Sequence, residues 1–201
     1  SGTGSEATKN AVISEVGPEG FKKSLRHENY VPDIALLDPE LTLDCPQDIT
    51  AASGMDSFTQ LTEAFLSTQA SDYTDAFAWF GLKAVKKSLL KVVKDMDDLE
   101  ARNNMSFAAL NSGICLANAG LGTIHGFASP IGATFDIPHG IVCGTLMAAV
   151  NRINVHELKK NYPQSIIMKK YAILGQMFLE DTEKKDNYYI DGFIDYLYWL
   201  S

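Results

Sequence analysis

The sequence predicts a mainly α-helical protein that opens with a short β-containing segment. Apolar residues recur at helical spacing in several segments after residue 46, whereas short β-type runs are confined to residues 11–38. With 46% hydrophobic residues in a chain of 201, the protein can bury a sizeable core. We therefore expect two parts, residues 1–45 with strands and turns and residues 46–201 with helices.

The first part contains two runs that favour strands. They are "AVIS" at residues 11–14 and "IALLD" at residues 34–38. Glycines and prolines separate the runs, and both residue types favour turns over helices. These turn residues are Gly17, Pro18, Gly20 and Pro32.

The second part begins with two amphipathic helices. In residues 54–67, Phe58, Leu61 and Phe65 fall at helical spacing, while polar residues fall on another face. Residues 73–96 repeat this pattern with an apolar stripe opposite a lysine face. The stripe is Leu82, Val85, Leu89, Val92 and Met96, and the lysines are Lys83, Lys87, Lys91 and Lys94.

Four further helices complete the expected helical part. Residues 106–120 are small and apolar nearly all round, which is typical of a central, closely packed helix. Another helix should begin near Pro138, because proline suits the first helical turn. Two more are expected at about 163–180 and 187–200.

Composition excludes some classes of function. The chain has 17 Lys and Arg against 25 Asp and Glu, a net charge of −8 that would repel a nucleic-acid backbone. The apolar run at residues 114–135 contains too many glycine, proline and polar residues to span a membrane as a helix. Three cysteines without a CxxC pair favour reduced thiols, so we expect a cytoplasmic protein. The sequence starts with a turn-like segment and ends in a helix-like segment without a stop signal, so we expect a fragment.

Asp56 and Gln60 are the first candidates for chemistry. They are four residues apart on the expected helix, so both side chains could point toward one place. The alternative is structural, because Ser53 followed by Asp56 resembles a capping box that satisfies backbone donors at a helix start.

The segment "GLGTIHGFASPIGATFDIPHG", residues 120–140, carries two of the four histidines. His125 and His139 are each followed by glycine, which lets a backbone or a ligand approach closely. Neutral imidazole is a common metal ligand, and with one carboxylate it would form a mixed site suited to Fe(II) or Zn(II). The alternative is a pair of hydrogen-bonded core histidines.

Several motifs in this order resemble the iron-containing (group III) alcohol dehydrogenase family. They are "SGTGSEATKNAVIS", "PDIALLDPELT", "AASGMDSFTQLTEAF" and the glycine-rich segment at 120–140. The resemblance runs from residue 1 to about 155. It implies the all-helical C-terminal domain of that family, preceded by a β-containing remnant of its α/β nucleotide-binding domain and incomplete at its end.

The resemblance also implies a metal site. Asp56, His125 and His139 stand where the family binds its metal, and Gln60 stands where the family has a further histidine. An amide oxygen is a harder, neutral donor, so metal binding should be weaker or changed in preference. Ser129 occupies a position where many members have a proton-relaying histidine; a serine hydroxyl can pass a proton but cannot hold one near pH 7.

The implied reaction is the interconversion of a primary alcohol and an aldehyde with NAD or NADP, in a homodimer. The loop residues and strand residues that the resemblance assigns to the dinucleotide are Thr3, Gly4, Ser5, Val12 and Lys23. The family's Gly-Gly-Gly-Ser-type pyrophosphate loop has no counterpart in these residues, so the isolated chain should be inactive.

Three alternatives remain open from the sequence. One is a metal-free reductase of the maleylacetate type. Another is a subgroup that oxidises the terminal hydroxymethyl group of a sugar acid, suggested by Gln60 and Ser129. The last is a catalytically inactive helical module in which the two histidines belong to the core.

Overall fold

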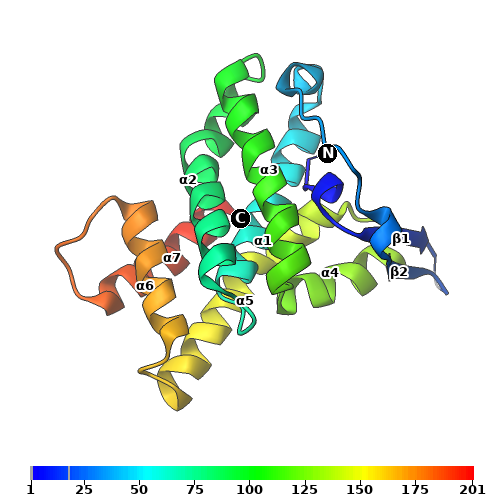
Figure 1. Cartoon of the computed structure of the whole chain (residues 1–201). Helices are drawn as coiled ribbons and strands as arrows, with labels where there is room; N and C mark the ends of the chain where they lie inside the picture. The colour runs from blue at the N-terminus through cyan, green and yellow to red at the C-terminus, as the bar shows by residue number, and fades with distance from the viewer. Residues whose placement is uncertain (1, 18) are drawn as a thin grey trace. The chain divides into compact units, whose positions relative to one another are not determined.

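The computed structural model describes residues 2–17 and 19–201, and it confirms a mainly α-helical fold. Pro18, one of the expected turn residues, lies outside the described residues. The chain forms two compact units, Ser1–Cys143 and Gly144–Ser201. The elements, shown in Figure 1, are β1 (Asn10–Glu15), β2 (Phe21–Arg26), α1 (Gln47–Phe65), α2 (Asp72–Lys94), α3 (Leu99–Ala119), α4 (Thr123–Thr134), α5 (His139–Asn161), α6 (Ile166–Leu179) and α7 (Asp186–Leu200), with short 3-10 turns η1 (Ser5–Ala7), η2 (Glu28–Tyr30) and η3 (Pro39–Thr42).

The core of the first unit lies between α1, α2 and α3, which pack against one another (Figure 1). α1 is buried without interruption from Asp56 to Phe65, so its polar residues are enclosed together with the expected apolar ones. α2 begins at a capping box between Ser71 and Thr74, and its apolar stripe is buried while its lysines are exposed. Met96, the last residue of the predicted apolar stripe, lies outside the helix, because α2 ends at Lys94.

Phe58 is fully buried in α1, and this burial supports a stability prediction. We expect Phe58→Ala to lower the free energy of unfolding by about 3–5 kcal/mol, because it leaves a cavity in the core. Chemical denaturation followed by circular dichroism measures the loss. Phe80→Ala, on the 57% exposed side chain of α2, is the matched control and should change stability by less than about 0.5 kcal/mol. Equal effects of both substitutions would contradict this core.

The β segment differs in part from the prediction. β1 covers the expected "AVIS" run and pairs antiparallel with β2, opposing Val12 to Ser24. β2, which reads FKKSLR, was not predicted. Residues 34–38 are not a strand, so that prediction was wrong: Ile34 and Leu36 are 84% and 90% exposed, and no described strand pairs with this run. A strand without a hydrogen-bonding neighbour has nothing to stabilise it.

The helices after residue 120 also show one difference. α5 starts at His139, directly after Pro138, as predicted. α4 was not predicted as a helix, because glycines and the internal Pro130 obscure its period. In the second unit α6 packs against α7, where a methyl group on Gly175 would lie 2.0 Å from the Tyr189 carbonyl oxygen.

No single helix among the described residues combines the length and apolar composition that crossing a membrane requires. α3 and α4 taken together meet both criteria, but the chain bends by 104° between them.

Candidate metal centre and adjoining cavity

Four potential ligand side chains meet in the first unit. They are Asp56 from α1, His125 from α4, and His139 and Cys143 from the start of α5. One ligand atom from each lies within 4.8 Å of all the others. The Asp56 Oδ1 atom is 3.0 Å from His125 Nε2 and 3.9 Å from His139 Nε2. The structure therefore brings together the three residues that the sequence singled out as metal ligands.

Asp56 does not cap a helix. α1 begins at Gln47 after Pro46, so both Ser53 and Asp56 lie inside it, and the capping-box interpretation is wrong. The Asp56 side chain is 6% exposed. Burial alone would raise the pKa of this carboxyl group, but the hydrogen bond with His125 and the charges of both histidines hold the pKa below its usual value. The site therefore contains a buried carboxylate.

His125 lies between two carboxylates. Its Nδ1 is 2.6 Å from Glu63 Oε2, while Glu63 Oε1 accepts a hydrogen bond of 2.7 Å from the Ile124 backbone N–H. Burial lowers the pKa of His125, but hydrogen bonds with Asp56, Cys143 and Glu63 outweigh it and raise the pKa to about 11. The surroundings thus stabilise positive charge at this point, which is what a cation site requires.

His139 reaches the cluster because α5 starts against the backbone of α1. A methyl group on Gly140 would lie 2.1 Å from the Ala52 carbonyl oxygen, so only glycine permits this approach. The pKa of His139 lies below its usual value, mainly because the side chain is buried. Attraction to Asp56 opposes this shift, whereas the charge of Lys22, whose Nζ lies 3.4 Å from His139 Nδ1, adds to it. A neutral imidazole is the form that binds metal.

Gln60 follows Asp56 by one turn of α1 and is 5% exposed. Its Oε1 atom is buried and has no hydrogen-bond partner among the described residues. An unpaired buried carbonyl is costly, and a cation or a substrate hydroxyl would relieve that cost. Together with one carboxylate and two imidazoles, this oxygen fits a divalent transition metal.

The cluster borders a cavity of about 560 Å³. Most sequence-predicted site residues line it, including Ser129, which follows His125 by one turn of α4. Gly126 also lines it, and beyond its own helix backbone and chain neighbours no atom of the described residues lies within 4 Å of a methyl group added there, so this glycine leaves space for a ligand. The lining residues are Thr3, Ser5, Thr8, Asn10, Val12, Lys22, Ser24, Arg26, Asp56, Gln60, Leu116, Gly120, Leu121, Gly122, His125, Gly126, Ser129 and His139.

The hairpin contributes alternate residues to this cavity. Asn10 and Val12 of β1 and Lys22 and Ser24 of β2 line it, as the two-residue period of a strand requires. Lys23 is not among the lining residues, and its Nζ lies 5.6 Å from the centre of the Phe21 ring. The structure thus places Lys22, not Lys23, beside the cluster, and the assignment of Lys23 to the cofactor stays a prediction.

Gly4 holds its loop against α3 and does not line the cavity. Its φ of 74° is left-handed, and a methyl group there would lie 2.0 Å from the Ala109 carbonyl oxygen. One hydroxyl fixes the loop, because Ser57 Oγ donates to the Gly2 carbonyl at 2.8 Å. Ser112 Oγ donates to the Ala109 carbonyl at 2.7 Å and lies 3.4 Å from the Thr3 carbonyl. These contacts keep Thr3 and its neighbours at the edge of the cavity.

Gly4→Ala should therefore destabilise the first unit. The left-handed conformation costs alanine about 1–2 kcal/mol and the collision with α3 adds about 1–3 kcal/mol. We expect the free energy of unfolding to fall by at least about 2 kcal/mol in denaturant titrations. Gly126→Ala is the control and should leave stability unchanged or slightly higher, because its added methyl group meets open space. A neutral Gly4→Ala would contradict this packing.

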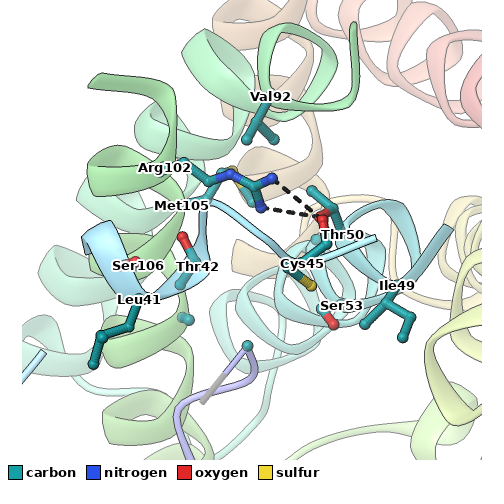
Figure 2. A pocket seen from close by; sticks show the side chains of 13 residues that line it. Leu41, Thr42, Cys45, Ile49, Thr50, Ser53, Val92, Arg102, Met105 and Ser106 are labelled. Carbon is teal, nitrogen blue, oxygen red and sulfur yellow. Dashed lines mark hydrogen bonds between the residues drawn. The ribbon is translucent and has the colours of Figure 1, made fainter. Parts of the chain in front are cut away.

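A second, smaller cavity of about 260 Å³ lies beside η3, α1 and α3 (Figure 2). Arg102 is buried there and donates hydrogen bonds to Thr50 Oγ1 at 3.0 Å and to the Met96 carbonyl at 2.9 Å. A longer bond of 3.5 Å reaches the Cys45 carbonyl. These bonds connect the start of α1 to α3, so Arg102 has a structural role.

Sequence reasoning missed Glu63, Cys143 and Lys22. Glu63 carries a helical signal, because it lies seven residues after Asp56, about two turns along the same face of α1. Cys143 lies four residues after His139, on the next turn of α5. Lys22 could have been found only with β2 recognised as a strand.

Comparisons with known proteins identify the family of this chain. Residues 50–195 match the model of the Fe-containing alcohol dehydrogenase family, C-terminal part. The chain is 41% identical over 154 residues to 1-propanol dehydrogenase PduQ of Salmonella typhimurium, which covers 77% of this chain and 41% of that protein. It is 35% identical over 154 residues to the NAD-dependent methanol dehydrogenase of Bacillus methanolicus, covering 77% and 40%.

Solved structures give the same result. An alcohol dehydrogenase from Oenococcus oeni matches with a TM-score of 0.87 and 30% identity over 98% of this chain and 49% of that one. The chain thus spans about two fifths of the length of these curated relatives and about half of that solved structure. The matched residues include all four side chains of the cluster, and the chain belongs to the Fe-containing alcohol dehydrogenase family.

Proposed function

We propose that this chain forms the metal-binding part of an NAD(P)-linked oxidoreductase that interconverts a primary alcohol and an aldehyde. One observation carries the proposal: Asp56, His125 and His139 converge beside the cavity that Val12 and Ser129 also line. The names of relatives support the reaction, since one acts on 1-propanol and another on methanol.

Asp56, His125 and His139 would hold the metal, Fe(II) or Zn(II), with the Gln60 amide oxygen as a further donor. A cation held there would supply Lewis acidity toward the substrate oxygen. The protein fixes the ligands beforehand: Glu63 orients His125, and Gly140 lets His139 approach α1. A buried, carboxylate-rich setting of this kind favours cation binding.

Ser129 would handle the proton of the substrate hydroxyl. It lines the cavity one helical turn from His125, on the same side of α4. A hydroxyl both accepts and donates, and Ser129 Oγ can therefore pass a proton toward solvent without retaining it. The open space at Gly126 would accommodate the substrate carbon chain.

The nicotinamide dinucleotide, NAD or NADP, supplies the hydride chemistry. Thr3, Ser5 and Val12 are proposed to contact it from the hairpin side of the cavity, with Gly4 shaping the loop. A relative named an NAD-dependent dehydrogenase supports this cofactor. The family resemblance adds Lys23 as a further contact, a homodimer and a cytoplasmic location to the proposal.

The test uses the full-length protein that contains this sequence, stripped of metal by a chelator and reloaded with Fe(II) or Zn(II). Primary alcohols, including a sugar acid with a terminal hydroxymethyl group, are offered with NAD⁺ or NADP⁺ while nicotinamide reduction is followed. We expect turnover only after reloading. Undiminished turnover without metal would favour the metal-free reductase, and metal binding without turnover on any substrate would favour the inactive module.

A further inference from the structure

We infer that Cys143 is a metal ligand, and that its thiolate replaces the imidazole that the chain lacks at Gln60. This inference rests on the metal site of the proposed function and extends it to an unexpected donor. The chain would hold its cation with one carboxylate, two imidazoles and one sulfur, and a further position would take the Gln60 oxygen or the substrate oxygen.

The distances around Cys143 carry the inference. Its Sγ atom lies 3.7 Å from His125 Nε2 and 3.7 Å from His139 Nε2. With zinc–sulfur and zinc–nitrogen bonds of about 2.3 Å and 2.0–2.1 Å, a sulfur and a nitrogen bound to one zinc ion at a near-tetrahedral angle lie about 3.6 Å apart. The distances from Asp56 Oδ1 to Nε2 of the two histidines are 3.0 and 3.9 Å. They lie on either side of the separation of about 3.3 Å expected between an oxygen and a nitrogen bound to one zinc ion.

The helix fixes this placement. Cys143 follows His139 by four residues on α5, so both side chains point from one face toward the same place. Close packing of Gly140 on Ala52 sets the position of this first turn of α5. A metal bound by His139 would therefore lie within reach of Cys143 without movement of the backbone.

The other buried cysteine behaves differently. Cys115 Sγ lies 3.5 Å from the Thr74 carbonyl oxygen, an ordinary core contact for a thiol. Cys143 is also a buried free thiol, but its sulfur meets nitrogens and the Asp56 carboxylate, which are metal-ligand atoms. Burial alone therefore does not explain its surroundings.

Charge and donor type agree with the assignment. On metal binding the Cys143 S–H bond breaks, the sulfur keeps the electron pair and binds the cation, and the proton leaves to solvent. One carboxylate and one thiolate then neutralise a divalent cation, whereas the Gln60 amide adds no charge. A soft sulfur donor favours Zn(II) over Fe(II), so we expect a preference for zinc.

Cobalt titration of the purified chain tests the inference without any assay of activity. Co(II) bound to a thiolate gives an intense near-ultraviolet charge-transfer band, which oxygen and nitrogen ligands do not give. We expect this band to saturate at one equivalent of Co(II) and to disappear in Cys143→Ser. The matched control Cys115→Ser should keep the band, and so should Gln60→Ala.

A second measurement needs no variant, in case Cys143→Ser folds poorly. Alkylation of the native wild-type chain, followed by mass spectrometry, reports on each thiol. Saturating Zn(II) should slow the modification of Cys143 and leave that of the half-buried Cys45 unchanged. Equal modification of Cys143 with and without bound Zn(II) would contradict the inference.

The outcomes separate this inference from the proposed function. Co(II) that binds without the band, or with a band that survives Cys143→Ser, would overturn the sulfur ligand and leave a metal site of Asp56, His125 and His139. Failure to bind Co(II), Zn(II) and Fe(II) would overturn both the sulfur ligand and the metal dependence of the proposed function.

Discussion

Asp56→Asn is expected to lower the affinity of the purified chain for Zn(II) by more than about 100-fold. Replacing an outer-shell partner of a ligand typically costs about 10- to 100-fold, and the loss of a charged ligand should exceed that. Asp56 is the one carboxylate among the four clustered side chains, and asparagine preserves its size while removing its charge. Competition with a chromophoric chelator gives the affinity, and elemental analysis after dialysis gives the amount of metal retained.

Asp48→Asn provides the control for this substitution. Asp48 lies on the same helix, in its first exposed turn, so the change removes one charge from α1 far from the cluster. Its effect on metal affinity should be negligible. One full equivalent of metal retained by Asp56→Asn would contradict the assignment of Asp56 as a ligand and would favour histidines that serve only the core.

The helices that the sequence predicts best are those whose partners are apolar. Phe58 and Leu61 are buried as their spacing indicates, and the stripe of α2 is buried opposite its lysines. Apolar residues recur at helical spacing because one face of the helix packs against a core, so these helices can be predicted without knowing the fold. α4 breaks this rule because its glycines and the internal Pro130 interrupt the apolar period, and one of these glycines, Gly126, lines the cavity.

β2 was missed for a related reason. Its alternate residues Lys22, Ser24 and Arg26 are polar because they face the cavity, so the strand lacks the apolar alternation by which strands are recognised. The run at residues 34–38 has the reverse property, being apolar yet exposed. β1 is half exposed as well, so local pattern alone does not distinguish the apolar run that finds a pairing partner from the run that does not.

Three of the four clustered side chains could be predicted as candidate metal ligands, but their arrangement could not. Asp56, His125 and His139 were singled out by residue type and resemblance, and the structure brings them together. The contacts of Glu63 and Cys143 depend on how α4 and α5 meet α1, which no spacing along the chain reveals. Gly140 shows why, since its close approach to Ala52 determines where α5 begins.

Glu63→Gln is expected to lower Zn(II) affinity by about 10- to 100-fold, although Glu63 need not touch the metal. When His125 binds metal through Nε2, its Nδ1 carries the proton and needs an acceptor, which Glu63 Oε2 supplies at 2.6 Å. The other oxygen accepts from the Ile124 N–H. A glutamine has one oxygen for these two donors, so one of them loses its acceptor whichever way the amide turns.

A buried donor without an acceptor costs about 1–3 kcal/mol, which agrees with the size of the expected loss in affinity. Glu100→Gln, on an exposed glutamate paired with Lys87, is the control and should leave metal affinity unchanged. Thermal unfolding without metal separates a loss of fold from a loss of affinity. If Glu63→Gln binds Zn(II) as tightly as the wild type, the orientation of His125 does not depend on Glu63, and α4 alone holds the imidazole in place.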